Sequence, residues 1–100
     1  MLPVKADVVV IGGGVIGSSI AYYLSKRRLS VVLLERDAIG SGTSSACDGL
    51  VFLQTKKPGS HLKLAMESRK LYESLSEELD FNIEYRNCGG MILIESELEL

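Results

Sequence analysis

The sequence is poor in the residues that build metal sites and covalent nucleophiles. Its 100 residues include two cysteines and one histidine. Cys47 and Cys88 are too few and too far apart in the sequence to indicate a metal site, and a disulfide is not expected in a cytosolic chain. We expect two free thiols that are buried rather than reactive. His61 stands alone, and a solvated imidazole is a more frequent role for such a residue than catalysis.

Long apolar runs and targeting signals are also missing. No segment approaches the roughly 18 apolar residues that a membrane span requires. The N-terminus has no apolar run that leads to a small-residue cleavage site. A net charge of −2 does not favour nucleic acid as a partner. With 46% hydrophobic residues, we therefore expect a cytoplasmic protein of ordinary globular composition.

What the sequence does contain is a glycine-rich turn between an apolar run and a helical pattern. Residues 8–11 (VVVI) predict a buried strand, and glycines follow at positions 12, 14 and 17. Gly12 lets the chain turn tightly, Gly14 lets the backbone approach a pyrophosphate, and Gly17 lets helix and sheet pack closely. Because the turn leads into a helix N-terminus, which attracts anions, it predicts a dinucleotide site.

A second apolar run ends in an acid at the distance typical of such a site. Residues 31–34 (VVLL) predict a parallel strand, and Glu35 lies 18 residues after Gly17, close to the roughly 20 expected. The Glu35 carboxylate can accept hydrogen bonds from a ribose diol and would repel a 2′-phosphate, so NADP is the least favoured dinucleotide. The alternative is a glycine turn without a ligand, which the combination of strand, turn, helix, strand and acid disfavours.

The helix between these strands is predicted to have one apolar face. Its last residues, Lys26, Arg27 and Arg28, complement the negative end of the helix dipole, which explains them better than nucleic-acid binding. The residues expected to pack on the sheet as core are Ile16, Ile20, Ala21, Tyr23 and Leu24.

A segment of small, polar residues follows at 40–49 (GSGTSSACDG). Glycine and serine are ordinary loop residues, so a flexible surface loop is one interpretation. The other is a second set of donors, in which backbone N–H groups and the hydroxyls of Thr43, Ser44 and Ser45 return toward the nucleotide. The residues alone leave the two interpretations even.

The second half of the chain changes pattern. After a turn at 56–59, Ser60 is a candidate cap for an amphipathic helix over residues 61–79. Residues 82–86 alternate and 91–94 are apolar, which predicts a β-hairpin connected by residues 88–90. The helix face expected to be buried consists of Leu64, Ala65, Ser68, Leu71, Tyr72, Leu75 and Leu79.

These patterns predict an α/β fold whose N-terminal βαβ portion is Rossmann-like. We expect the βαβ unit and its loop at 1–55 and the start of a second α+β domain at 56–100. Two parallel strands are fewer than the five or six of a complete doubly wound sheet. Ser96 resembles the cap of a further helix. We therefore expect an incomplete fold, either part of a larger protein or dependent on a partner surface.

With these features together, the sequence resembles the glycine oxidase and D-amino acid oxidase family of FAD-dependent oxidoreductases over essentially all of its length. The glycine turn, Glu35–Arg36, the 42–49 segment and the 89–91 segment carry the resemblance. It implies FAD as the cofactor and favours the functional interpretation of the loop. The implied cofactor-binding residues are Gly12, Gly14, Val15, Ile16, Gly17, Glu35, Arg36, Thr43, Ser44, Ser45, Gly49 and Leu50.

Two positions depart from the family pattern. Arg28 stands where the family usually has a glycine at the helix end. Either a left-handed arginine there costs roughly 1 to 2 kcal/mol, or the helix ends differently. Ala46 stands where some relatives attach FAD through a histidine. Covalent attachment of FAD at this position is therefore not expected.

The resemblance implies oxidation of a carbon–nitrogen bond by hydride transfer to the flavin, with glycine, sarcosine or a D-amino acid as substrate. The substrate-binding groups of the family come from later in the sequence, so we name no catalytic residue and expect the 100 residues alone to be inactive. The alternatives are an NAD-dependent dehydrogenase domain and a non-catalytic module that acts by self-association, as a homo-oligomer or with a partner subunit.

Overall fold

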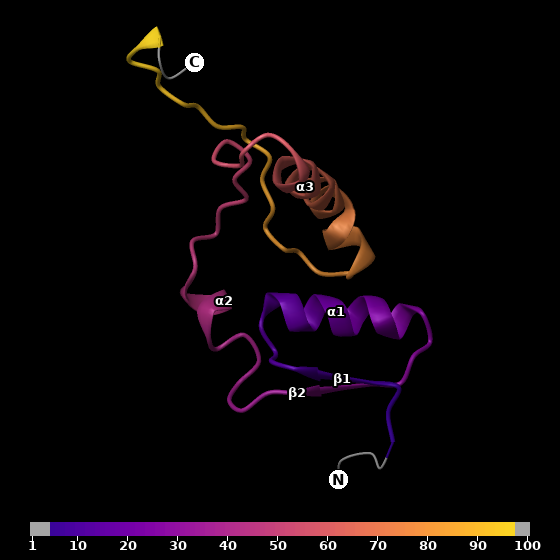
Figure 1. The fold of residues 1–100 in the computed structure, drawn as a ribbon. Helices are drawn as coiled ribbons and strands as arrows, with labels where there is room; N and C mark the ends of the chain where they lie inside the picture. The colour runs from indigo at the N-terminus through magenta and orange to yellow at the C-terminus, as the bar shows by residue number, and fades with distance from the viewer. Residues whose placement is uncertain (1–4, 98–100) are drawn as a thin grey trace. The chain divides into compact units, whose positions relative to one another are not determined.

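A computed structural model describes residues 5–97. In chain order the elements are β1 (Val8–Ile11), α1 (Val15–Lys26), β2 (Val31–Leu34), α2 (Thr43–Ala46) and α3 (Ser60–Glu78), as Figure 1 shows. The chain divides into two compact units, the first ending at Gly49 and the second beginning at Leu50. The further helix expected from Ser96 would extend into residues 98–100, which lie outside the described residues.

The first unit is a βαβ arrangement, as the sequence predicts. β1 and β2 form a parallel pair in which Val8 lies opposite Val31 and Ile11 lies opposite Leu34. The β-branched residues of both strands favour this extended backbone. α1 connects the two strands and lies along the pair (Figure 1). The expected strands and the α/β class are confirmed. The burial expected for residues 8–11 holds only for Val10, which is 8% exposed, because Val9 and Ile11 are 55% and 87% exposed.

The face that α1 turns toward the sheet agrees only in part with the expected one. Ile16, Ile20 and Tyr23 are 74%, 47% and 39% exposed, so their expected place in the core is wrong. Ala21 and Leu24, which were also expected to pack on the sheet, are half-buried, together with Gly17 and Ser18. The reason is the close approach at Gly17, where a Cβ would run into the Gly12 carbonyl oxygen and lie 3.4 Å from Val10 Cγ1. Glycine thus brings its own side of the helix onto the sheet.

α1 ends in a Schellman motif with an arginine in the left-handed position. The Arg28 N–H donates to the Ser25 carbonyl at 2.9 Å, and the Leu29 N–H donates to the Leu24 carbonyl at 3.4 Å. Arg28 has a φ of 62°, which the motif requires and for which glycine is the usual residue. The helix therefore keeps the geometry that a glycine would allow, and Arg28 carries the strain.

In the second unit, α3 covers the residues expected to be helical but begins differently. Its N-cap is Gly59, with a φ of 119° and no side-chain hydrogen bond, and Ser60 is already helical. The expected Ser60 cap is therefore wrong. Leu64, Leu71 and Leu79 are 72%, 53% and 40% exposed, so the expected stripe is only partly covered. The half-buried positions are Leu62, Ala65, Arg69, Tyr72, Leu75 and Ser76.

This rotation of the covered face follows from the segment that packs on α3. The Ser76 hydroxyl accepts a hydrogen bond of 3.2 Å from the Ile83 N–H, and the Tyr72 and Tyr85 rings lie 5.4 Å apart between centroids. The segment after α3 therefore runs back along the side that carries Tyr72 and Ser76.

The hairpin expected at residues 82–94 is not formed. The structure gives residues 82–95 no strand. Glu84 has a φ of 56°, outside the extended region, and its N–H is bonded to the Asn82 side chain at 2.9 Å. Met91 and Leu93 are 85% and 80% exposed. An alternating pattern becomes a strand only where a neighbour pairs with its backbone, and this segment packs on a helix instead.

Candidate functional site

The end of β1, the N-terminus of α1 and the residues of α2 surround an open groove of about 460 Å³. Several residues predicted from the sequence come together here: Gly12, Gly14, Val15, Ile16, Gly17, Thr43 and Ser44. Sequence reasoning missed Val10, Ile11, Ile20 and Cys47, which also line it. Ile16 and Ile20 are exposed because they face this groove. The periodic pattern that assigned them to the core detects an apolar face but not which surface it meets.

The glycine turn has the geometry that its spacing predicts. Gly12 has a φ of 103°, and its N–H donates to the Leu34 carbonyl at 2.8 Å, so the turn continues the pairing of β1 with β2. Such a φ favours glycine because it lacks a Cβ. Together with the approach of Gly17 to the Gly12 carbonyl, this turn places the start of α1 directly beyond the end of β1.

The N-terminus of α1 presents backbone donors to the groove. The first intrahelical bond runs from the Ser18 N–H to the Gly14 carbonyl at 2.9 Å. The N–H groups of Val15, Ile16 and Gly17 precede it and have no acceptor within the helix. The Val15 N–H donates to the Ser44 hydroxyl. The N–H groups of Ile16 and Gly17, added to the positive end of the helix dipole, make the groove suitable for a phosphate.

Glu35 lies beside the same turn, at the end of β2. Its Oε2 accepts a hydrogen bond of 2.7 Å from the Gly13 N–H, and its Oε1 accepts one of 3.0 Å from the Asp37 N–H. The Gly13 N–H, followed by the Asp37 N–H, lowers the pKa of Glu35 below its ordinary value. The carboxylate is therefore held ionised, and its remaining lone pairs can accept from a diol.

Gly13 is a residue that sequence reasoning passed over. Its N–H binds Glu35, and its carbonyl accepts a hydrogen bond of 3.0 Å from the Gly40 N–H. A Cβ here would lie 2.5 Å from Ile39 Cδ1 and 3.3 Å from both Glu35 Cβ and Leu33 Cδ2. The glycine at the middle position of the run 12–14, which the spaced motif does not require, was the signal that this position is crowded.

The small-residue segment is fixed to the turn by a side chain. Thr43–Ala46 forms the short helix α2 within the expected loop, and the Ser44 hydroxyl accepts a hydrogen bond of 2.8 Å from the Val15 N–H. Cys47 is exposed, as is Cys88; both are free, and their expected burial is wrong. The remaining predicted residues, Arg36, Ser45, Gly49 and Leu50, are exposed, and Leu50 begins the second unit.

Comparison with known proteins defines the class. The family model described as FAD dependent oxidoreductase matches residues 7–100. The chain is 41% identical over 97 residues to glycine oxidase of Bacillus subtilis (strain 168), an alignment that covers 91% of the chain and 26% of that protein. It is 37% identical over 91 residues to the mitochondrial dimethylglycine dehydrogenase of Homo sapiens, covering 89% of the chain and 10% of that protein.

A third relative has a regulatory name. The mitochondrial pyruvate dehydrogenase phosphatase regulatory subunit of Mus musculus is 37% identical over 98 residues, covering 96% of the chain and 11% of that protein. The chain thus spans between 10% and 26% of the length of these three relatives.

The chain belongs to the FAD-dependent oxidoreductase family. The family resemblance and the expected cofactor, FAD, are confirmed. The alternative of an NAD-dependent dehydrogenase domain is accordingly set aside. None of the helices described between residues 5 and 97 is long and apolar enough to cross a membrane. The same residues hold no cluster of three or more metal-ligating side chains.

Proposed function

We propose that the groove binds the ADP moiety of FAD. The observation that carries this proposal is the hydrogen bond of 2.7 Å from the Gly13 N–H to the Glu35 carboxylate. It holds an acceptor for the ribose hydroxyls next to the N-terminus of α1, which would receive the pyrophosphate. The groove fits these groups in chemistry, with backbone donors for an anion and an ionised acid for a diol. The binding residues proposed at the groove are Gly12, Gly14, Val15, Ile16, Gly17, Thr43 and Ser44, with Glu35 beside the turn. The cofactor contacts expected of Arg36, Ser45, Gly49 and Leu50 stay predictions.

For the whole protein we propose oxidation of a carbon–nitrogen bond in a small amine or amino acid. The names of the relatives, glycine oxidase and dimethylglycine dehydrogenase, support a substrate of the glycine type. Bound FAD would supply the acceptor for a hydride equivalent. The first 55 residues would hold the cofactor, and residues 56–100 would begin the substrate domain. No residue of this chain is assigned a catalytic role.

A non-catalytic role is the second candidate, and one observation favours it. The chain is 37% identical to a protein named as a regulatory subunit. Under this proposal the FAD-binding unit would bind a partner protein or a second copy of the chain, and it would not catalyse a reaction. The cytoplasmic location expected from the sequence stays a prediction, since the relatives include a bacterial protein and mitochondrial ones.

The first experiment is a visible absorption spectrum after incubation with excess FAD and desalting, with NAD tested in parallel by calorimetry. Retained flavin bands support the cofactor site; their absence, at a concentration where the protein is folded, contradicts it. Glu35→Ala should lose flavin, whereas Ser19→Ala, which removes a hydroxyl from the exposed side of α1, should keep it.

A second experiment separates the two candidate functions in the protein that includes its substrate domain. Anaerobic bleaching of the flavin by glycine, sarcosine or dimethylglycine would support an amine oxidoreductase. Bound flavin that none of these amines or a D-amino acid reduces would favour the non-catalytic role. Reoxidation by oxygen, compared with an artificial electron acceptor, then distinguishes an oxidase from a dehydrogenase.

A further inference from the structure

The loop between β2 and α2 is held on the glycine turn at Gly13. The Gly40 N–H donates a hydrogen bond of 3.0 Å to the Gly13 carbonyl. The Ile39 side chain covers the same residue, since a Cβ at Gly13 would lie 2.5 Å from Ile39 Cδ1. Gly13 is buried, whereas Ile39 is 64% exposed. One hydrogen bond and one apolar contact thus fasten residues 39 and 40 to the turn.

The two ends of this loop each carry a part of the proposed cofactor site. At its start, Glu35 accepts the Asp37 N–H at 3.0 Å on one carboxylate oxygen and the Gly13 N–H at 2.7 Å on the other. At its end, α2 brings Thr43 into the groove. Because the loop joins the ribose acceptor to the wall of the groove, its attachment to Gly13 fixes both parts relative to the turn.

The absence of a side chain at Gly13 is what admits Ile39. The φ of Gly13 is outside the left-handed region, so backbone conformation does not explain a glycine here. The other two atoms near a Cβ at this position, Leu33 Cδ2 and Glu35 Cβ, lie at 3.3 Å and would have to give by only a few tenths of an ångström. Ile39 Cδ1 is the atom that an alanine methyl group would displace.

We propose that Ile39 is a positioning residue for FAD. Through its contact with the Gly13 Cα, it keeps the loop of residues 36–42 ordered before the cofactor binds. The inference rests on the proposed FAD site. Ordering a loop costs conformational entropy, and a loop that is already ordered does not add this cost to the binding step. Displacement of Ile39 should therefore weaken FAD binding even though the residues of the groove are unchanged.

The proposal predicts that a change at Ile39 rescues a change at Gly13. FAD dissociation constants are compared for the unmodified protein, Gly13→Ala, Ile39→Val and the double variant. Gly13→Ala pushes Ile39 Cδ1 aside and should bind FAD roughly fivefold more weakly. Ile39→Val removes that carbon atom and should bind within about twofold of the unmodified protein. In the double variant the alanine methyl group takes the space of the missing Cδ1, so binding should return to within about twofold.

The rescue separates the Ile39 contact from other effects of a methyl group at residue 13. A methyl group that blocked the cofactor, or that pressed on Leu33, would weaken FAD binding in the double variant as much as in Gly13→Ala. Ser41→Ala is the control within the loop, because it changes an exposed side chain and keeps the backbone bond to the Ala38 carbonyl. It should leave FAD binding unchanged. Without rescue in the double variant, the proposal is wrong.

Hydrogen exchange without FAD gives a readout that does not depend on cofactor binding. The Gly40 amide should exchange faster in Gly13→Ala than in the unmodified protein and should recover in the double variant, while amides late in α1 are unchanged. Unaltered Gly40 exchange in Gly13→Ala would overturn the inference, because the loop would then be held without Ile39. Failure of the unmodified protein to bind FAD would instead overturn the proposed site, with the exchange result still deciding the contact between Gly13 and Ile39.

Discussion

Glu35 and Gly13 are joined by a hydrogen bond of 2.7 Å from the Gly13 N–H to the Glu35 carboxylate. The bond links the end of β2 to the turn that follows β1, across 22 residues of sequence. One carboxylate therefore shapes the glycine turn and also stands where a ribose acceptor is expected. A dual role of this kind makes Glu35 a contributor to folding before any cofactor is bound.

The stability of the first unit should consequently depend on pH through Glu35. The Gly13 N–H, and then the Asp37 N–H, lower the pKa of Glu35 in the folded protein below its ordinary value of 4.5. The folded state then binds fewer protons than the unfolded state. The stabilising contribution of Glu35 is therefore complete at pH values above its ordinary pKa. It is lost as the pH falls through the lowered folded value.

Urea unfolding of the protein and of Glu35→Gln, followed between about pH 7 and pH 3, measures this dependence. Glu35→Gln should be less stable at neutral pH and should lose less stability on acidification. Parallel curves for the two proteins would contradict the role given to this carboxylate.

Arg28→Gly should stabilise the protein. Arg28 holds a φ of 62°, whereas Arg27 holds −86°. Relief of the left-handed strain should raise the free energy of unfolding by about 1 kcal/mol, which corresponds to an increase in Tm of roughly 4 to 8 °C. Arg27→Gly removes the same charge at a normal φ and should destabilise by about 0.5 to 1 kcal/mol. Thermal unfolding of both variants checks the prediction. Equal changes in Tm for the two variants would show that the lost charge, rather than the backbone conformation, determines the effect on stability.

Gly17→Ala should disrupt the packing of α1 on the sheet. The added methyl group would run into the Gly12 carbonyl oxygen, which is backbone and has little freedom to move. We expect a loss of about 3 kcal/mol in the free energy of unfolding, together with loss of FAD binding. Gly42→Ala is the matched control, because a Cβ there would meet nothing within 4 Å. This variant should lower the free energy of unfolding by about 1 kcal/mol or less. Denaturant unfolding of the two variants distinguishes a steric clash from a general effect of replacing glycine.

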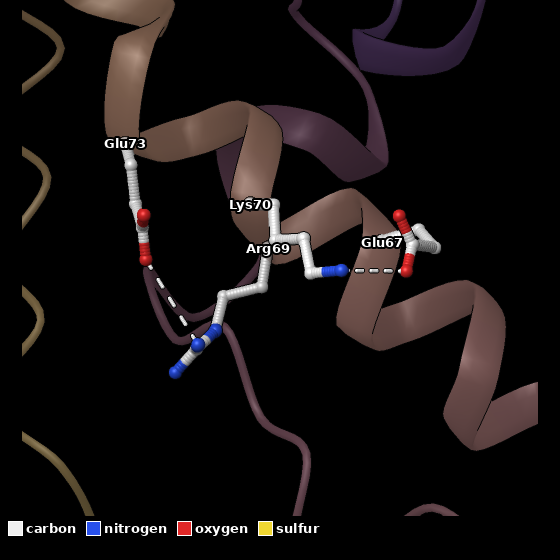
Figure 2. Close-up of polar contacts among 4 residues, drawn as sticks. All are labelled: Glu67, Arg69, Lys70 and Glu73. Carbon is white, nitrogen blue, oxygen red and sulfur yellow. Dashed lines mark hydrogen bonds and ion pairs between the residues drawn. The ribbon is translucent and has the colours of Figure 1, made fainter.

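The ion pairs on the surface of α3 should contribute little. Lys70 Nζ lies 2.8 Å from Glu67 Oε1, and an Arg69 nitrogen lies 3.9 Å from Glu73 Oε1. Figure 2 shows both pairs on α3. All four side chains are more than a third exposed, so water screens both pairs. Glu67→Gln and Glu73→Gln should each change the free energy of unfolding by about 0.5 kcal/mol or less. Of the two, Glu67→Gln should have the larger effect, because its contact is shorter and its acid precedes the base. A change above about 1 kcal/mol in either variant would mean that the pair is not simply a surface contact.

Local chemistry explains which elements were predictable. The parallel strands at Val8–Ile11 and Val31–Leu34 were correct to the residue, because their runs of β-branched and apolar residues favour extended backbone and each run has the other as a pairing partner. The left-handed conformation of Arg28 was one of the outcomes that the sequence predicted, because the hydrogen bonds of the helix end set the conformation of that residue whatever its side chain.

Contacts between distant segments explain what was missed. Ile16 and Ile20 have the period of a core face, yet Gly17 brings the neighbouring side of α1 onto the sheet and leaves them in the groove. The alternating residues after α3 predicted a hairpin, but their backbone packs on α3 and forms no ladder. Periodicity reports that a face is apolar, and it contains no information about the surface that covers it.

The sequence by itself determined the βαβ unit, the glycine turn and the acid at the end of β2, because spacing along the chain sets backbone conformation over a few residues. Only the tertiary structure decided that Glu35 binds the Gly13 N–H and that Ser44 takes the N–H of Val15. These bonds connect residues 22 and 29 positions apart. They form because strand pairing and the turn bring together donors and acceptors that no local pattern could assign to one another.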